Sequence, residues 1–430
     1  MSLPAAPGRP SRRWVLATGA AAAMPVGVAV AARDRYRPQP GLRADGLAVV
    51  DGSVVEVPPG GSARFVPGSR VLTSAAPGPG SADAIAADRR WLAAGRVPGG
   101  PRFAPLAERA LLDLRSLTLP SGAALAGWSG PWRYLWPRDA AFVVAAFTAT
   151  GHPDSARAVL HHLTRIAPAD GRWQARYIPD GSGRAPDGRG VQTDGAGWVL
   201  WAADAWAAAA RDPVAGLRLL WPMLASSADA LADSLGRNGL PGPSPDYWEV
   251  ATSKHSLGVA APVVAGLEAA VRLAGRVGDR QAAARWVGAA DRAASGLERT
   301  FGRHGWRRTA GGAFDAAVTF AGPPFTVDRG AGEVLDAAFA AARNANGGVR
   351  PGAGWRRDGI SWTPETALFG LAWASGGRPD RARDVLGWLS RHTTRLGSLP
   401  EKVRADRRPA AVAPLAWTCA TVLLTLDRLG

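Results

Sequence analysis

Residues 195–236 read GAGWVLWAADAWAAAARDPVAGLRLLWPMLASSADALADSLG, and this stretch decides the fold. Alanine, leucine and tryptophan recur at helical spacing on both sides of Arg211-Asp212-Pro213, which predicts one helix over 195–211 and a second over 213–236. The link between them is very short, so consecutive helices of this kind lie antiparallel. The stretch therefore predicts a helical hairpin.

The same pattern continues from residue 103 onward. Further helices are predicted over 103–118, 139–150, 153–167, 256–277, 279–302, 332–345, 362–377, 379–395 and 412–428. Short links alternate with long loops, which is typical of hairpins arranged in a ring, with the helices that follow the long loops on the inside. We therefore expect an all-α fold, an (α/α)6 toroid or barrel over residues 101–430. The inner position at 313–325 is short and ends in Pro323-Pro324, so eleven helices are the alternative.

The chain before residue 101 has a different composition. Two runs of β-branched residues flank Asp51-Gly52, which is a hairpin signal, and further short strands are predicted around Phe65 and Val71. We expect residues 33–100 to form a small β-rich N-terminal extension.

Residues 1–32 resemble a twin-arginine export signal. Arg12-Arg13 precedes an apolar stretch over 14–32, and Ala29-Val30-Ala31 is a candidate cleavage site. The stretch is about 19 residues long, enough to span a bilayer, so an uncleaved membrane tether is the alternative. Either way, we expect the protein outside the cell or on the outer side of the cytoplasmic membrane.

Composition argues against several other functions. The formal charge is +16, but only Lys254 and Lys402 among 51 basic residues are lysines, and the arginines are spread along the whole chain. Without a dense basic block or a recognition motif, we expect no nucleic-acid partner. The single Cys419 lies in an apolar run, and the six histidines lack the spacing of a metal site. We expect no metal and no cofactor, and we expect a monomer.

Four of the predicted long loops carry a polar and aromatic cluster next to the following helix. The clusters are Trp132-Arg133-Tyr134-Leu135-Trp136-Pro137-Arg138-Asp139, Gln192-Thr193-Asp194-Gly195, Asp246-Tyr247-Trp248-Glu249 and Leu399-Pro400-Glu401-Lys402, the last followed by Trp417. Sugar binding uses flat apolar rings for pyranose faces and bidentate polar groups for hydroxyls, and these clusters supply both.

Splitting a glycosidic bond needs two carboxyl groups, one to protonate the leaving group and one to activate water. Glu249 and Glu401 are our candidates, because each lies in a loop just before an inner helix. We expect them to face one pocket with carboxyl groups about 6.5–9.5 Å apart, the separation of an inverting enzyme. The structural alternatives are a helix-capping carboxylate for Glu249 and a solvated loop charge for Glu401.

Together, in this order, the four clusters resemble glycoside hydrolase family 15, the glucoamylase-like six-hairpin glycosidases, over residues 103–430. The resemblance implies the (α/α)6 barrel, Glu249 as general acid, Glu401 as general base, and Arg138 with Asp139 as the holders of the terminal glucose. It implies an exported hydrolase that cleaves α-linked glucosides or oligosaccharides from the non-reducing end. The expected substrate-binding residues are Trp136, Arg138, Asp139, Gln192, Asp194, Trp248, Lys254 and Trp417.

The sequence also departs from this pattern. Family members usually carry a second acidic residue after the general acid, whereas Val250 follows Glu249 here. A non-catalytic carbohydrate-binding or cell-envelope protein on the same toroid is therefore the main alternative. A lyase or isomerase with an α/α toroid is another.

Overall fold

The computed structural model describes residues 40–76, 78 and 80–430. The expected export signal at 1–32 lies outside these residues. The described residues cluster as one compact unit.

Six outer and six inner elements alternate along the described chain, and short links join most inner elements to the outer helix that follows. The outer elements are α3 (Gly100–Leu117), α5 (Pro153–Ile166), α7 (Val214–Asp233), α9 (Arg280–Thr300), α10 (Leu335–Ala342) and α12 (Pro379–Arg391). The inner elements are α4 (Pro137–Ala149), α6 (Asp194–Ala209), α8 (Leu257–Val277), the 3-10 helix η3 (Ala316–Ala321), α11 (Thr363–Ser375) and α13 (Ala416–Leu429).

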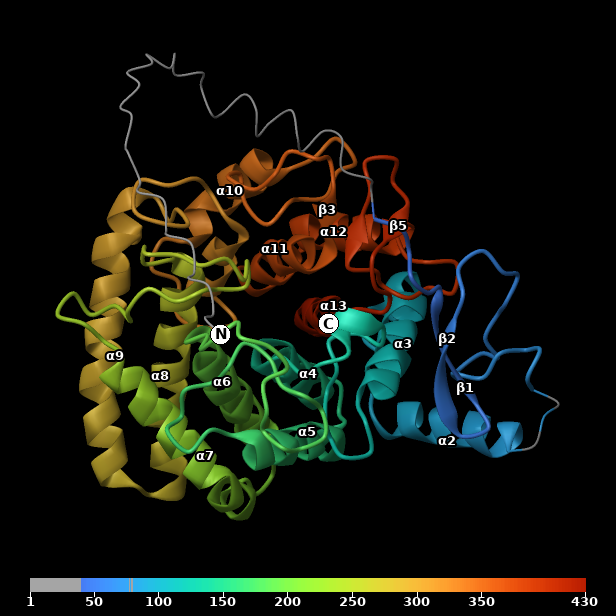
Figure 1. The fold of residues 1–430 in the computed structure, drawn as a ribbon, viewed down its shortest axis with the longest axis horizontal. Helices are drawn as coiled ribbons and strands as arrows, with labels where there is room; N and C mark the ends of the chain where they lie inside the picture. The colour runs from blue at the N-terminus through green and yellow to red at the C-terminus, as the bar shows by residue number, and fades with distance from the viewer. Residues whose placement is uncertain (1–39, 77, 79) are drawn as a thin grey trace, which may run out of the picture. The chain divides into compact units, whose positions relative to one another are not determined.

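The inner elements form a closed ring. Contacts run from α4 to α6, then to α8, η3, α11 and α13, and α13 packs back against α4. Figure 1 shows α4, α6, α11 and α13 around the centre, with α3, α5 and α9 farther out. The all-α (α/α)6 toroid is confirmed.

Burial explains which helices lie inside. Nearly every residue of α4, α6, α11 and α13 is buried, so these helices are apolar on all sides, whereas α5, α9 and α12 bury one face only. Within the described chain, α8 alone is long and apolar enough to cross a membrane, but most of it is buried inside the protein. It is a core helix of the ring.

Two segments of the ring contain little α-helix. The segment at 313–325 provides only the six residues of η3, which occupy the inner position between α8 and α11. The segment at 332–345 divides into the 3-10 helix η4 (Gly332–Val334) and α10. Two further 3-10 turns, η1 (Gly130–Trp132) and η2 (Gly302–His304), lie in long loops.

The N-terminal segment packs onto the toroid and is not wholly β-rich. Strands β1 (Gly46–Val50) and β2 (Ser53–Val57) form the expected antiparallel hairpin, and its turn residues Asp51 and Gly52 both have positive φ, at 48° and 75°. A bridge joins Phe65 to Leu72. However, the segment also contains the helix α2 (Ser81–Ala94), which the sequence pattern did not indicate.

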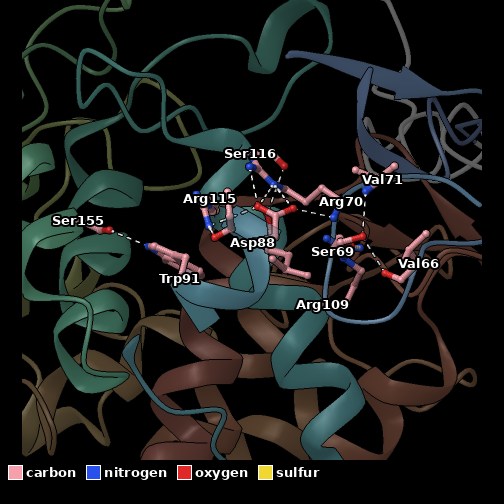
Figure 2. Close-up of polar contacts among 12 residues, drawn as sticks. Val66, Ser69, Arg70, Val71, Asp88, Trp91, Arg109, Arg115, Ser116 and Ser155 are labelled. Atoms are coloured by element: carbon pink, nitrogen blue, oxygen red, sulfur yellow. Dashed lines mark hydrogen bonds and ion pairs between the residues drawn. The ribbon is translucent and has the colours of Figure 1, made fainter. Parts of the chain in front are cut away.

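A buried carboxylate ties this segment to the toroid (Figure 2). Asp88 of α2 is fully buried and accepts hydrogen bonds from the backbone N–H and the guanidinium of Arg70 at 2.8–3.1 Å. Arg115 of α3 lies 3.3 Å from the same carboxylate. Trp91 donates to Ser155 of α5 at 3.3 Å. Residues 40–98 are therefore held in place by ion pairs as well as by apolar contacts.

Candidate active site

A cavity of about 250 Å³ opens where the long loops meet the N-termini of the inner helices. Its wall comes from segments far apart in the sequence: the start of α4, the loop before α6, the loop before α8, the start of α11 and the residues around α13. The lining residues are Ala126, Pro131, Trp132, Trp136, Arg138, Asp139, Arg176, Arg189, Tyr247, Trp248, Glu249, Trp362, Pro364, Glu365, Glu401, Leu415 and Trp417.

The cavity contains most of the residues predicted as the site. Both candidate carboxyl groups are present, together with five of the eight expected substrate-binding residues: Trp136, Arg138, Asp139, Trp248 and Trp417. The two glutamates are thus brought to one cavity by two loops that lie about 150 residues apart in the sequence.

Glu249 is presented by a tight turn. Its backbone N–H donates to the carbonyl of Asp246 at 2.7 Å, and its φ is 54°, a left-handed value that a residue with a β-carbon adopts at a cost. The Asp246 carboxylate supports the turn by accepting from the Trp248 backbone N–H at 3.0 Å and from Arg308 at 2.8 Å.

The Glu249 carboxyl group is held from two sides. Trp136 Nε1 donates to Oε1 at 2.5 Å, and Arg138 Nη2 lies 3.9 Å from the same oxygen. Arg189, which comes from the loop before α6, forms an ion pair with Oε2. These contacts favour the ionised carboxylate, and 21% of the side chain remains exposed.

Arg138 and Asp139 occupy the first turn of α4. Arg138 donates to Asp194 Oδ2 at 2.9 Å, and its guanidinium lies 5.2 Å from the centre of the Trp417 ring. Burial raises the pKa of Asp139 to about 6 against the lowering effect of Arg138, while Glu401 and Asp194 raise it further. Asp139 is therefore a carboxyl group that changes protonation near neutral pH.

Glu401 has fewer partners. Its side chain is 11% exposed, and Lys402 Nζ lies 3.4 Å from Oε2. That oxygen has no hydrogen-bond partner among the described residues. The backbone of Glu401 is fixed on both sides, because its N–H donates to Val412 at 2.8 Å and its carbonyl accepts from Thr363 at 3.0 Å. The carboxyl group is thus rigidly placed and free to bind a water or a hydroxyl.

A second layer lies behind the Glu249 loop. Tyr247 donates to the Asp315 carboxylate and to the carbonyl of Pro351, the latter at 3.2 Å. Arg308 lies 3.6 Å from Asp315 and 3.7 Å from the centre of the Trp248 ring. Burial raises the pKa of Asp315 to about 6, although Arg308 lowers it. This buried network connects the loop before α8 to η3.

Comparison with solved structures shows which proteins share this fold. A glycosidase variant superposes with a TM-score of 0.66 at 23% identity, covering 77% of this chain and 98% of that one. A bacterial glucoamylase complexed with acarbose gives 0.65 at 17% identity, covering 81% and 58%. A glucoamylase from Hypocrea jecorina gives 0.61 at 15% identity, covering 74% and 68%. No family model and no curated protein sequence matches the chain. The chain has the six-hairpin glycosidase fold.

Several lining residues of this glycosidase fold were not predicted as functional. Trp362 and Glu365 belong to a cluster, Trp362-Thr363-Pro364-Glu365, that resembles the other four in composition and also precedes an inner helix. That resemblance was the available signal. Arg176 and Arg189 lie in a loop rich in glycine and proline, where no comparable signal marks them.

Three expected substrate-binding residues lie outside the cavity. Asp194 is buried and supports Arg138, while Gln192 is buried in the loop before α6. Lys254 is exposed. It lies in a local turn in which the Thr252 hydroxyl contacts the backbone N–H and the carbonyl of Lys254. The structure therefore assigns Asp194 a supporting position and gives Lys254 no contact with the cavity.

Proposed function

We propose that this protein is a glycoside hydrolase that removes the terminal sugar from the non-reducing end of α-linked glucosides or oligosaccharides. The observation that carries the proposal is the convergence of Glu249 and Glu401, from separate loops, on one cavity that also contains Arg138 and Asp139. The solved structures with this fold include a glycosidase complexed with glucose and a glucoamylase complexed with acarbose.

The two carboxyl groups have different surroundings, which suits different tasks. In the proposed inverting reaction, Glu249 gives its proton to the glycosidic oxygen as the bond to C1 breaks. Glu401 takes a proton from the water that attacks C1 from the opposite face. Arg189, Trp136 and Arg138 then stabilise the ionised Glu249 that results.

The size and lining of the cavity favour action at a chain end. A volume of about 250 Å³ lies below the usual range for a drug-sized ligand, so the cavity suits one end of a sugar chain. Trp136, Trp248 and Trp417 supply apolar faces, and the Arg138–Asp194 pair fixes the orientation of a guanidinium beside Asp139.

One observation favours the non-catalytic alternative. Arg189 forms an ion pair with Glu249, and a carboxyl group kept ionised by a neighbouring cation has no proton to donate. If this pair persists with sugar bound, the protein binds carbohydrate without turnover.

The first experiment is release of glucose from maltose, isomaltose, trehalose and a chromogenic α-glucoside. We expect release from at least one of them, with β-glucose as the first product by NMR, because inversion converts an α linkage to a β product. Retention of the α configuration would contradict the inverting mechanism.

Matched variants separate catalysis from binding. Glu249→Gln and Glu401→Gln should each lower kcat by about 10²–10⁴-fold while calorimetric binding of a slow substrate survives, because the amide keeps the shape but moves no proton. Glu333→Gln is the control, since Glu333 is exposed on η4 outside the cavity. Turnover like that of the wild type in either cavity variant would remove that residue from the mechanism.

Export is part of the same proposal and rests on the sequence alone. Arg12-Arg13 and the apolar stretch over 14–32 direct the protein out of the cytoplasm. Outside the cytoplasm, it acts as a monomer on a small carbohydrate.

A further inference from the structure

Glu365 is a third glutamate in the cavity, and the reaction proposed above does not use it. It is 2% exposed, lies in the first turn of α11 and lines the cavity with Asp139 and Glu401. Its Oε2 atom is buried without a hydrogen-bond partner among the described residues. A buried carboxyl oxygen without a partner costs folding free energy, because the water it loses on burial is not replaced.

The backbone fixes Glu365 near Glu401. Strand β3 (Ser361–Trp362) pairs with β4 (Lys402–Val403), and β4 pairs with β5 (Pro409–Ala410), so that Trp362 lies opposite Lys402. The Thr363 backbone N–H then donates to the Glu401 carbonyl, and its hydroxyl contacts Thr418 of α13 at 2.7 Å. Glu365 follows two residues later on a rigid helix.

A bond to the N-cap residue does not account for this glutamate. A glutamate at the third helical position can bond the backbone N–H of the N-cap residue. Here the N-cap is Trp362, and its N–H already donates to the Val349 carbonyl at 2.7 Å.

Nor does an ion pair account for it. Arg189 and Arg138 lie beside Glu249, and Lys402 lies beside Glu401 and 4.0 Å from the centre of the Trp362 ring. Burial raises the pKa of Glu365 to about 8. A hydrogen bond from its own backbone N–H lowers the pKa and is the next largest effect, ahead of the raising effects of Glu401 and Asp315 and the lowering effect of Lys402. The group is therefore an uncharged carboxylic acid at neutral pH, with both a donor and an acceptor to offer.

We propose that Glu365 is a substrate-binding residue that hydrogen-bonds one hydroxyl group of the terminal sugar. The proposal rests on the function proposed above and adds a specificity residue to it. A sugar hydroxyl satisfies the buried carboxyl group, and a sugar that lacks this hydroxyl leaves it without a partner. Sites built in this way discriminate strongly against the analogue that lacks the polar group.

The test measures binding, so that it does not depend on turnover. Glu365→Gln keeps shape and hydrogen bonding, Glu365→Met keeps length without them, and Glu333→Met is the exposed control. Calorimetry would give Kd for methyl α-glucoside and its 2-, 3-, 4- and 6-deoxy analogues, after circular dichroism confirms that each variant is folded.

We expect Glu365→Met to weaken binding of the parent glucoside by about 10–100-fold, and Glu365→Gln to bind it within a few fold of wild type. One deoxy analogue should bind the wild type more weakly than methyl α-glucoside does. The same analogue and methyl α-glucoside should bind Glu365→Met with equal affinity. A merely structural role would weaken all five sugars alike.

Equal losses for all analogues, or a Glu365→Met variant that binds like wild type, would overturn the role of Glu365. Wild-type protein that binds these sugars but releases no glucose from any α-glucoside would overturn only the hydrolase. Wild-type protein that binds none of them would overturn both proposals.

Discussion

At the scale of single residues, the cavity combines carboxyl groups whose surroundings differ sharply. Glu249 contacts cations and an indole N–H, Glu401 has one lysine neighbour, and Glu365 has an oxygen without any hydrogen-bond partner among the described residues. Groups of one type placed in different environments can serve different tasks, which is how one site can combine acid and base chemistry.

The raised pKa of Glu365 predicts a pH-dependent effect on stability. Below a pH of about 4.5 the carboxyl is protonated in both the folded and the unfolded chain. Between pH values of about 4.5 and 8 the unfolded chain loses this proton while the folded chain retains it. The stability that this group contributes is therefore lost as pH rises. Glu365→Gln removes this loss, and its Tm relative to wild type should increase from pH 4.5 to pH 8.

The size of that effect is on the order of a few kcal/mol at pH 8. Glu401, Asp315 and Lys402 act on Glu365 and are present in both proteins, and Asp139 lines the same cavity, so the comparison largely cancels their contributions. Thermal unfolding of wild type, Glu365→Gln and the exposed control Glu333→Gln across this pH range checks it. A difference in Tm that stays constant with pH would contradict the prediction.

Arg138 is expected to need its planar guanidinium. It contacts Asp194, approaches Glu249 and lies beside the Trp417 ring, and an ammonium group cannot make these contacts together. Arg138→Lys should therefore lower kcat/KM by about 10–100-fold, nearly as much as Arg138→Ala. The exposed Arg211→Lys is the control, and full activity of Arg138→Lys would mean that charge alone suffices.

At the scale of the helices, close packing of α6 on α8 depends on two glycines. A β-carbon on Gly266 would lie 2.5 Å from the Gly197 Cα atom, and one on Gly197 would lie 2.2 Å from the Pro262 carbonyl oxygen. All these neighbours are backbone atoms, so the helices themselves would have to separate. Gly275, also in α8, has open space around it.

These two positions in one helix give opposite predictions. Gly266→Ala should lower the free energy of unfolding by about 1–3 kcal/mol or more, because overpacking shifts backbone. Gly275→Ala should raise it by about 0.5–1 kcal/mol, because alanine favours the helix. Urea unfolding of both variants measures the change, and equal effects at the two positions would refute the packing argument.

The helices were predictable because their signal is local and repeated. All eleven predicted helices appear within a few residues of their expected ends, apart from 332–345, where a 3-10 turn precedes a short helix. Helix α2 was missed because it buries only Asp88 and Leu92 fully and so has little apolar periodicity. The four polar and aromatic clusters were predictable because each lies at or before the start of an inner helix.

The remaining site residues depend on long-range structure. Arg189 reaches Glu249 through a loop whose course is set by bridges such as Leu135 to Tyr177 and Gln174 to Val191, which local sequence does not specify. Glu365 was overlooked because an acidic residue in the first turn of a helix is ordinarily explained by the helix dipole. Its burial becomes evident only once β3 and β4 pair.

At the scale of the whole molecule, the N-terminal segment belongs to the same cooperative structure as the toroid. Asp88→Ala would leave the Arg70 and Arg115 guanidinium groups, which are partly buried, without their carboxylate. We expect a loss of about 3–5 kcal/mol and a single unfolding transition at lower temperature. Calorimetry showing a separate early transition for the segment would contradict this.

Export is the other property of the whole chain. If Arg12-Arg13 is read by a twin-arginine system, replacing both with lysine should retain the precursor in the cytoplasm. Fractionation of cells that express either form, with an antibody against the toroid, measures the distribution. Unchanged appearance outside the cytoplasm would rule out this route and leave other export signals open.

The two ends of the inner helices lie next to different parts of the molecule. The N-termini of α4, α11 and α13 line the cavity, whereas the C-termini of α4, α6, α8 and α11 lead into short links, at 150–152, 210–213, 278–279 and 376–378. Helices of 13–21 residues place these links about 20–30 Å from the chemistry. Evolution, or an engineer, can therefore change substrate preference through the long loops and thermal tolerance through the short ones, each with little effect on the other.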